Sequence, residues 1–221
     1  MLGRAHVSTC VIDDASAQRY SGETHNFITN DGRTKADVLC AAGADIARYP
    51  SIERRDDRVL GVVKDALSYE LETEAGETIT ARRLVIATGF PEFGDTCGIE
   101  GLRTQFGRTV FTCPFCHGYE FSGARIALIG GGEADGQFLG TLANWSPHID
   151  YITHDAAQTE KAARTLGQVS DGSFVEGRIV RLDNDGAQGV ATLEDGRQIA
   201  ADAFFAADLP VSLSSPLADS L

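Results

Sequence analysis

The apolar and polar positions in the first half of the chain predict one helix among short strands. Val38, Ala42 and Ile46 recur at the spacing of one helical face. Residues 15–32 are polar and rich in glycine, asparagine and aspartate, which predicts a loop. The predicted elements are, in order, a strand, a helix and four short strands, at 7–13, 35–48, 59–63, 68–72, 78–80 and 83–87.

The second half predicts a βα pattern followed by a β-meander. An apolar strand at 125–129 runs into what we call the glycine turn, Gly130-Gly131-Gly132-Glu133, and then into a helix. A strand at 149–154 and a helix at 156–166 follow. The chain up to residue 205 then predicts a meander, with glycine-containing turns at 184–186 and 194–196. Four glycines within 90–107 indicate a linker, so we expect a domain boundary near residue 105.

Composition excludes some classes of partner. The chain has 221 residues, 43% of them hydrophobic, and a formal net charge of -13, which argues against a nucleic-acid partner and an anionic membrane surface. No apolar run reaches the roughly 20 residues of a membrane span, and the first residues lack the apolar core of a signal peptide. We therefore expect a cytoplasmic globular protein.

Five cysteines in a chain of this length do not form a secreted disulfide framework. Cys10 lies in a predicted strand and Cys40 in a predicted helix, so both are expected to pack as small core residues. Cys97 lies in a glycine-rich loop and receives no role. The remaining two, Cys113 and Cys116, form the close C-x-x-C pair, which we call the redox pair.

The redox pair predicts thiol–disulfide chemistry. His117 directly follows Cys116, and its ordinary pKa of about 6.5 suits proton exchange with a thiol. Zinc is the competing interpretation, but a structural zinc site needs further cysteine or histidine ligands at regular spacing, and only one such pair exists here. A pair of inert structural cysteines is the third. We expect no metal, and Glu120 is interpreted as a surface carboxylate.

The glycine turn after an apolar strand is typical of a dinucleotide-binding unit, where glycines let the backbone approach a pyrophosphate. Gly130 and Gly132 fill the first two positions of G-x-G-x-x-G, but Asp135 occupies the third. A plain βα turn without a ligand is therefore the alternative. The next strand ends in His154-Asp155, and an acid there favours NADH over NADPH. Asp13 ends the first strand in the same way.

The run Cys113-Pro114-Phe115-Cys116-His117-Gly118-Tyr119-Glu120, followed by the strand and the glycine turn, resembles the low-molecular-weight thioredoxin-reductase family. More narrowly, it is similar to the branch with C-P-x-C-H-G-Y-E. Val85-Ile86-Ala87-Thr88-Gly89 resembles the family's A-T-G segment near the flavin, and Val11-Ile12-Asp13 the strand end that meets the FAD ribose. The resemblance covers nearly the whole chain.

This resemblance implies an α/β fold with two Rossmann-like doubly wound domains and β-meander insertions, the first domain incomplete. It divides the chain into a partial FAD-binding-type domain, an NAD(P)-binding-type domain carrying the redox pair, and the start of a return to the first, at 1–105, 106–209 and 210–221. The family's G-x-G-x-x-G for FAD, its later G-D segment and its basic NADPH segment have no counterpart in this sequence. We therefore expect the first 105 residues to be less stable than 106–209.

The resemblance also implies roles for single residues. Cys116 faces the flavin, Cys113 exchanges with the substrate and His117 moves protons. Asp13, Ala87, Thr88 and Gly89 are the implied FAD contacts, with the glycine turn (Gly130, Gly131, Gly132, Glu133) for NAD(P)H.

The predicted function is that of a thioredoxin-reductase-like, FAD-dependent disulfide oxidoreductase, in which electrons pass between nicotinamide, FAD and the redox pair. The partner is a protein or small-molecule disulfide or dithiol, possible examples being thioredoxin-like proteins, and the resemblance implies a homodimer. Two alternatives stay open: a dithiol oxidase that uses oxygen, and a degenerate redox or binding module without flavin.

Overall fold

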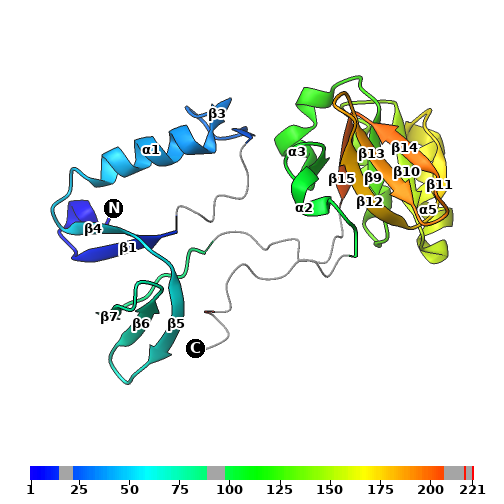
Figure 1. Cartoon of the computed structure of the whole chain (residues 1–221). Coiled ribbons are helices and arrows are strands. Elements are labelled where there is room, and N and C mark those ends of the chain that lie inside the picture. Colours follow the sequence, from blue (N-terminus) through cyan, green and yellow to red (C-terminus); the bar gives the residue numbers. More distant parts are fainter. Residues whose placement is uncertain (15–21, 89–97, 207–216, 218–220) are drawn as a thin grey trace. The chain divides into compact units, whose positions relative to one another are not determined.

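The computed structural model describes residues 1–14, 22–88, 98–206, 217 and 221, and its contacts divide the chain into two compact units (Figure 1). Among the described residues, the first unit contains 1–14, 33–88, 217 and 221, and the second contains 22–32 and 98–206. The domain limits predicted above stay predictions.

The first unit combines a parallel strand pair, a helix and an antiparallel meander. β1 (Thr9–Asp13) pairs in parallel with β4 (Ile52–Asp56), in a register that joins Asp13 to Asp56. The Thr34 hydroxyl caps the intervening helix by accepting the Asp37 amide at 3.1 Å. The other elements of this unit are η1 (Gly3–Ala5), β3 (Arg33–Thr34), α1 (Lys35–Ile46), β5 (Val59–Lys64), β6 (Tyr69–Thr73) and β7 (Thr78–Ala81).

Three sequence predictions for this unit are wrong. The charged strand β4 was not predicted, because Glu53, Arg54 and Arg55 hide its β character. No strand is described at 83–87, where Val85 is 80% exposed, because no described strand pairs with that segment. Cys10 and Cys40 are exposed and do not lie in a core, since β1 belongs to a two-stranded sheet and α1 buries none of its residues.

The second unit is built on a five-stranded, fully parallel sheet in the order β11-β10-β9-β15-β8. A three-stranded antiparallel meander, β12-β13-β14, forms a separate sheet. Both predicted meander turns are present, with Gly186 at φ 95° and Gly196 at φ 86°. The strands outside the meander are β2 (Glu23–Thr24), β8 (Val110–Phe111), β9 (Ile126–Ile129), β10 (Ile149–Thr153), β11 (Phe174–Glu176) and β15 (Ala203–Ala206).

The meander packs on one face of this sheet, and α4 and α5 pack on the other (Figure 1). The remaining elements of the unit are α2 (Leu102–Gln105), α3 (Pro114–His117), η4 (Tyr119–Phe121), α4 (Asp135–Leu142), α5 (Ala156–Val169), β12 (Ile179–Asn184), β13 (Gly189–Leu193) and β14 (Gln198–Ala201). Ala127 and Ile129 pack against the meander, whereas Ile126 and Leu128 pack against α4 and α5. This alternation follows the two-residue period of a strand, and it makes three layers with a core on each side of the sheet.

The parallel sheet brings the two sequence motifs to one edge. Cys113 follows the carboxyl end of β8, and Gly130 follows the carboxyl end of β9. β15 lies between these two strands and pairs in parallel with both. The carboxyl edge of a parallel sheet is where ligands bind in open α/β folds, so this edge carries the candidate site.

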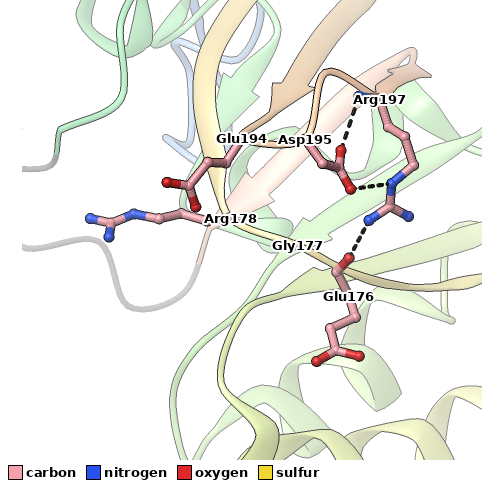
Figure 2. A pocket seen from close by; sticks show the side chains of 6 residues that line it. All are labelled: Glu176, Gly177, Arg178, Glu194, Asp195 and Arg197. Atoms are coloured by element: carbon pink, nitrogen blue, oxygen red, sulfur yellow. Dashed lines mark hydrogen bonds and ion pairs between the residues drawn. The ribbon is translucent and has the colours of Figure 1, made fainter.

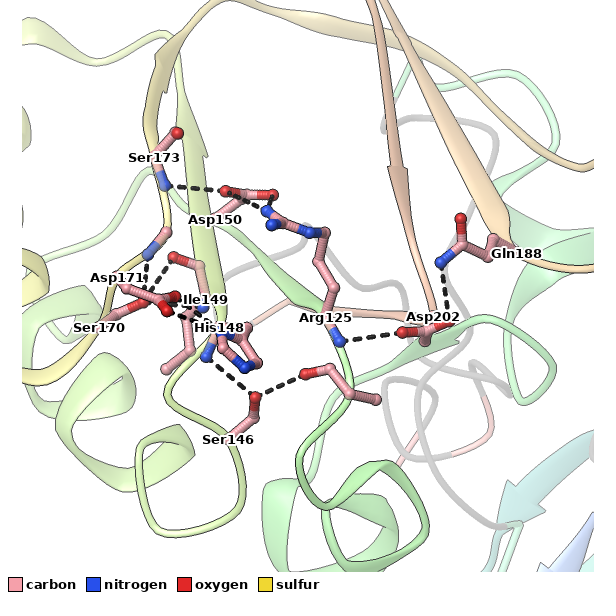
Figure 3. A network of polar contacts seen from close by, with 12 residues as sticks. Arg125, Ser146, His148, Ile149, Asp150, Ser170, Asp171, Ser173, Gln188 and Asp202 are labelled. Atoms are coloured by element: carbon pink, nitrogen blue, oxygen red, sulfur yellow. Dashed lines mark hydrogen bonds and ion pairs between the residues drawn. The ribbon is translucent and has the colours of Figure 1, made fainter.

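The opposite edge is held by a polar network (Figure 3). The Arg125 guanidinium contacts Asp150 at 3.0 Å, and the Arg125 amide donates to Asp202 at 2.9 Å. Asp150 in turn accepts the Ser173 amide at 2.8 Å. These contacts tie together the amino ends of β9, β10 and β15, so we interpret the network as structural.

Within the described residues, none of the helices is both long and apolar enough to cross a membrane.

Candidate functional site

The redox pair is closed as a disulfide at the start of a short helix. Cys113 is the N-cap residue of α3, Pro114 is its first residue, and Cys116 lies in its single turn. The Cα atoms of the two cysteines are 5.3 Å apart, and the Cys116 amide donates to the Cys113 carbonyl at 3.2 Å. Proline at the first helical position costs no hydrogen bond, because that amide has no partner within a helix. Both cysteines are half-buried.

His117 packs under the redox pair on an aromatic core residue. Its ring stacks on Phe111 with a centroid distance of 4.5 Å, and Phe111 in turn contacts Phe205 of β15. Burial lowers the pKa of His117 below its ordinary value, while the nearby Glu120 carboxylate acts in the opposite direction. The imidazole is therefore neutral near pH 7 and can accept a proton.

A segment distant in sequence contacts the short helix and His117 beside the redox pair. Residues 22–32, which we call the histidine segment, belong to the unit of the redox pair. His25 Nε2 lies 3.4 Å from Glu120 Oε1, and its Nδ1 lies 3.5 Å from Asp31 Oδ1. The His25 and His117 rings meet edge to face at 6.5 Å, and the Asn26 amide donates to the Phe115 carbonyl of α3.

Sequence reasoning missed His25 and Asn26, because 15–32 was interpreted only as a loop. Glu120 was interpreted as a surface carboxylate, and its side chain is 36% exposed while contacting His25. The available signal was one histidine within a polar loop, which by itself is weak. Among the described residues, no group of three or more histidine, cysteine, aspartate or glutamate side chains is arranged to hold a metal ion.

The glycine turn follows β9 as predicted, but a side chain of the protein fills it. Asp135 Oδ2 accepts the Gly131 amide at 2.8 Å and the Gly132 amide at 3.2 Å. The same oxygen accepts the Tyr151 hydroxyl at 2.6 Å. Asp135 is 1% exposed and Tyr151 is fully buried, so the turn amides meet a carboxylate inside the protein.

The predicted FAD contacts are described in part. Asp13 ends β1 and accepts Arg54 Nη2 at 2.8 Å, and both side chains are partly exposed. An acid at the end of a parallel strand is the kind of residue that binds the ribose of a dinucleotide. Ala87 and Thr88 follow the first meander in a stretch that is neither helix nor strand, and Gly89 lies outside the described residues.

A shallow depression of about 380 Å³ lies elsewhere on the second unit (Figure 2). Its central cation is bonded within the protein: Arg197 donates to Asp195 at 2.7 Å and to the Glu176 backbone carbonyl at 2.6 Å. These bonds fix the turn between β13 and β14, so we assign the depression no ligand.

Comparison with known proteins places this chain among thioredoxin-reductase-like folds. No protein-family model matches it. The "putative thioredoxin reductase TrxB" of Bacillus anthracis superposes with a TM-score of 0.87 at 21% identity, over 100% of this chain and 74% of the other. An oxidoreductase from Agrobacterium tumefaciens superposes with a TM-score of 0.81 at 26% identity, over 99% of this chain and 72% of the other. The predicted α/β class with Rossmann-like organisation is confirmed.

Among curated relatives, "thioredoxin reductase tcpT" of Claviceps purpurea is 26% identical over 100% of this chain and 71% of its own length. Two further relatives are matched over only 33% and 49% of their length. The comparisons confirm the predicted resemblance to thioredoxin-reductase-like FAD oxidoreductases, and with it the predicted enzyme class. They imply FAD and a nicotinamide nucleotide for proteins of this kind, and they do not support the predicted preference for NADH.

Proposed function

We propose that the chain carries the dithiol–disulfide centre of a flavin-dependent thiol–disulfide oxidoreductase. The single observation that supports this most directly is the closed redox pair at the carboxyl edge of the parallel sheet, with His117 next to it. The fold and the relatives support the same class. Zinc needs four ligands and free thiolates, which one closed cysteine pair does not supply, and inert cysteines do not account for the half-buried imidazole beside the pair.

The proposed chemistry is thiol–disulfide exchange. A thiolate of the substrate attacks Cys113 Sγ, the disulfide breaks, and Cys116 leaves as a thiolate. The second substrate thiolate then attacks the substrate sulfur of the mixed disulfide and releases Cys113. The substrate loses two electrons and two protons and becomes a disulfide, and the redox pair becomes a dithiol. The reverse sequence reduces a substrate disulfide.

His117 is the proposed proton carrier of this exchange. Burial keeps its imidazole neutral near pH 7, so it can take the proton of a thiol and return it to the departing sulfur. We propose that His25, which meets the His117 ring and contacts Glu120, holds this imidazole in place.

FAD is the proposed electron partner of Cys116. When bound, FAD accepts two electrons from the dithiol or supplies them to the disulfide. Asp13 is the residue described here that would hold its ribose, with Ala87, Thr88 and Gly89 as further proposed contacts.

A dithiol oxidase is the second candidate, and one observation favours it. The Asp135 carboxylate fills the glycine turn, where a nicotinamide nucleotide would place its pyrophosphate. In this version oxygen is the final acceptor, and two electrons and two protons from the dithiol reduce it to hydrogen peroxide.

The proposed partner is a protein or small-molecule disulfide or dithiol, for which a thioredoxin-like protein is one candidate. Phe115 and Tyr119 flank the redox pair with 68% and 79% exposure, which suits an apolar substrate. A net charge of -13 opposes a nucleic-acid partner. A homodimer and a cytoplasmic location complete the proposal.

The test is electron transfer from a dithiol in the presence of FAD. We expect Cys116→Ser to abolish reduction of the flavin by the dithiol, whereas Cys40→Ser, which changes an exposed cysteine of the other unit, leaves it intact. Unchanged reduction in the Cys116→Ser variant would contradict the proposed role of the pair.

A further inference from the structure

We propose that Asp135 closes the glycine turn to the pyrophosphate of NADH and NADPH. In this chain the glycines serve to seat an internal carboxylate. The inference concerns nucleotide binding, so it stands or falls separately from the thiol chemistry proposed above.

The backbone amides of the glycine turn are already occupied. In a dinucleotide-binding turn, backbone amides after the first strand point at the phosphates. Here the amides of Gly131 and Gly132 both donate to Asp135 Oδ2, at 2.8 and 3.2 Å. A phosphate oxygen would have to displace a carboxylate that belongs to the same polypeptide and is held one turn away.

A buried tyrosine of the sheet anchors the Asp135 carboxylate. Tyr151 of β10 donates its hydroxyl to the same oxygen at 2.6 Å, and Tyr151 is fully buried. Moving Asp135 out of the turn would break this buried hydrogen bond to a carboxylate, which is unfavourable. The carboxylate is therefore fixed from the sheet as well as from the turn.

Gly130 is a glycine because Tyr151 and Asp135 occupy the space beside it. A side chain at this position would collide with the Tyr151 ring and with Asp135 Oδ2. The glycine that the sequence interpretation assigned to pyrophosphate approach thus makes room for Tyr151 and Asp135.

The negative charge of Asp135 also opposes a bound pyrophosphate. Asp135 places a carboxylate at the amides, and the neighbouring Glu133 adds an exposed one. The buried Asp135 carboxylate opposes a pyrophosphate, because like charges repel most strongly where water is excluded, whereas water and salt screen the exposed Glu133. The other oxygen, Asp135 Oδ1, is buried and has no hydrogen-bond partner among the described residues, so the carboxylate reaches this place at a cost that the three bonds to Oδ2 offset.

The test is to measure the binding of NADH and NADPH to the purified chain by calorimetry. We compare the wild type with the double variant Asp135→Ser/Tyr151→Phe, which empties the turn and removes the hydroxyl that would lose its acceptor. Glu133→Gln is the matched control, because it removes an adjacent exposed charge and leaves the turn filled. Circular dichroism and thermal unfolding establish that each variant is folded.

We expect no saturable binding by the wild type or by Glu133→Gln, and a gain of at least about tenfold in affinity for the double variant. If the double variant does not fold, Asp135→Ala, which also removes the acceptor from the turn amides, must show the gain. Saturable binding by the wild type would overturn the inference. So would folded Asp135 variants without a gain, or an equal gain in Glu133→Gln.

Discussion

Replacing Tyr151 by phenylalanine tests the filled glycine turn through stability alone. The ring stays and only the hydroxyl is lost, so apolar packing changes little. That hydroxyl is fully buried and donates to Asp135 Oδ2 at 2.6 Å. Burial and this hydrogen bond also raise the pKa of Tyr151 well above its ordinary value, so the hydroxyl is a donor at every accessible pH.

A hydrogen bond to a charged group contributes about 1.5 to 3 kcal/mol to stability. We therefore expect Tyr151→Phe to lower the free energy of unfolding of the second unit by that amount, which is about tenfold to about 150-fold in the unfolding equilibrium. Urea titration followed by fluorescence measures it, because Trp145 is the chain's one tryptophan and lies in this unit.

The matched control is Tyr119→Phe, since Tyr119 lies in the same unit and is 79% exposed. Its effect should stay within about 0.5 kcal/mol. If both variants lose the same stability, the Tyr151 hydroxyl does not hold Asp135, and the account of the turn fails.

Three further predictions concern the pH dependence of thiol exchange, the pH dependence of stability and the protection against hydrogen exchange. In the wild type, the rate of thiol exchange should persist to below pH about 6.5, because burial lowers the pKa of His117. In His117→Gln, the fall of the rate on the acid side should move up toward the ordinary thiol pKa of about 8.5. Identical pH–rate profiles of the two proteins would show that His117 takes no part in the reaction. The folded state should also lose stability as the pH falls through this lowered pKa, because the unfolded state then binds more protons. Hydrogen exchange should show weaker protection at 33–88 than at 98–206. The hydrophobic cluster of the first unit has three buried residues, whereas the second unit has clusters of twelve and eleven. Equal protection of the two segments would refute the prediction.

The second unit was largely predictable because its signals are local. The apolar run 126–129, the glycine turn and the apolar spacing after it sit next to one another in sequence, and Gly186 and Gly196 mark turns by themselves. The redox pair needed only its own spacing to be recognised.

The missed features depend on contacts distant in sequence. β4 becomes a strand by pairing with β1, although its own residues are mostly charged. His25 contacts Glu120, although the two residues are far apart in sequence. The sequence marked Asp135 as a defect of the glycine turn, but only the position of Tyr151 shows that the defect is a filled site.

The central claim is that the redox pair exchanges electrons with FAD. The most direct measurement is the visible flavin spectrum of the purified chain with added FAD, recorded while a small dithiol is titrated in under nitrogen. We expect a bound flavin band that bleaches with the dithiol in the wild type and persists in Cys116→Ser. A chain that binds no flavin, or a flavin that bleaches equally in both proteins, would contradict it.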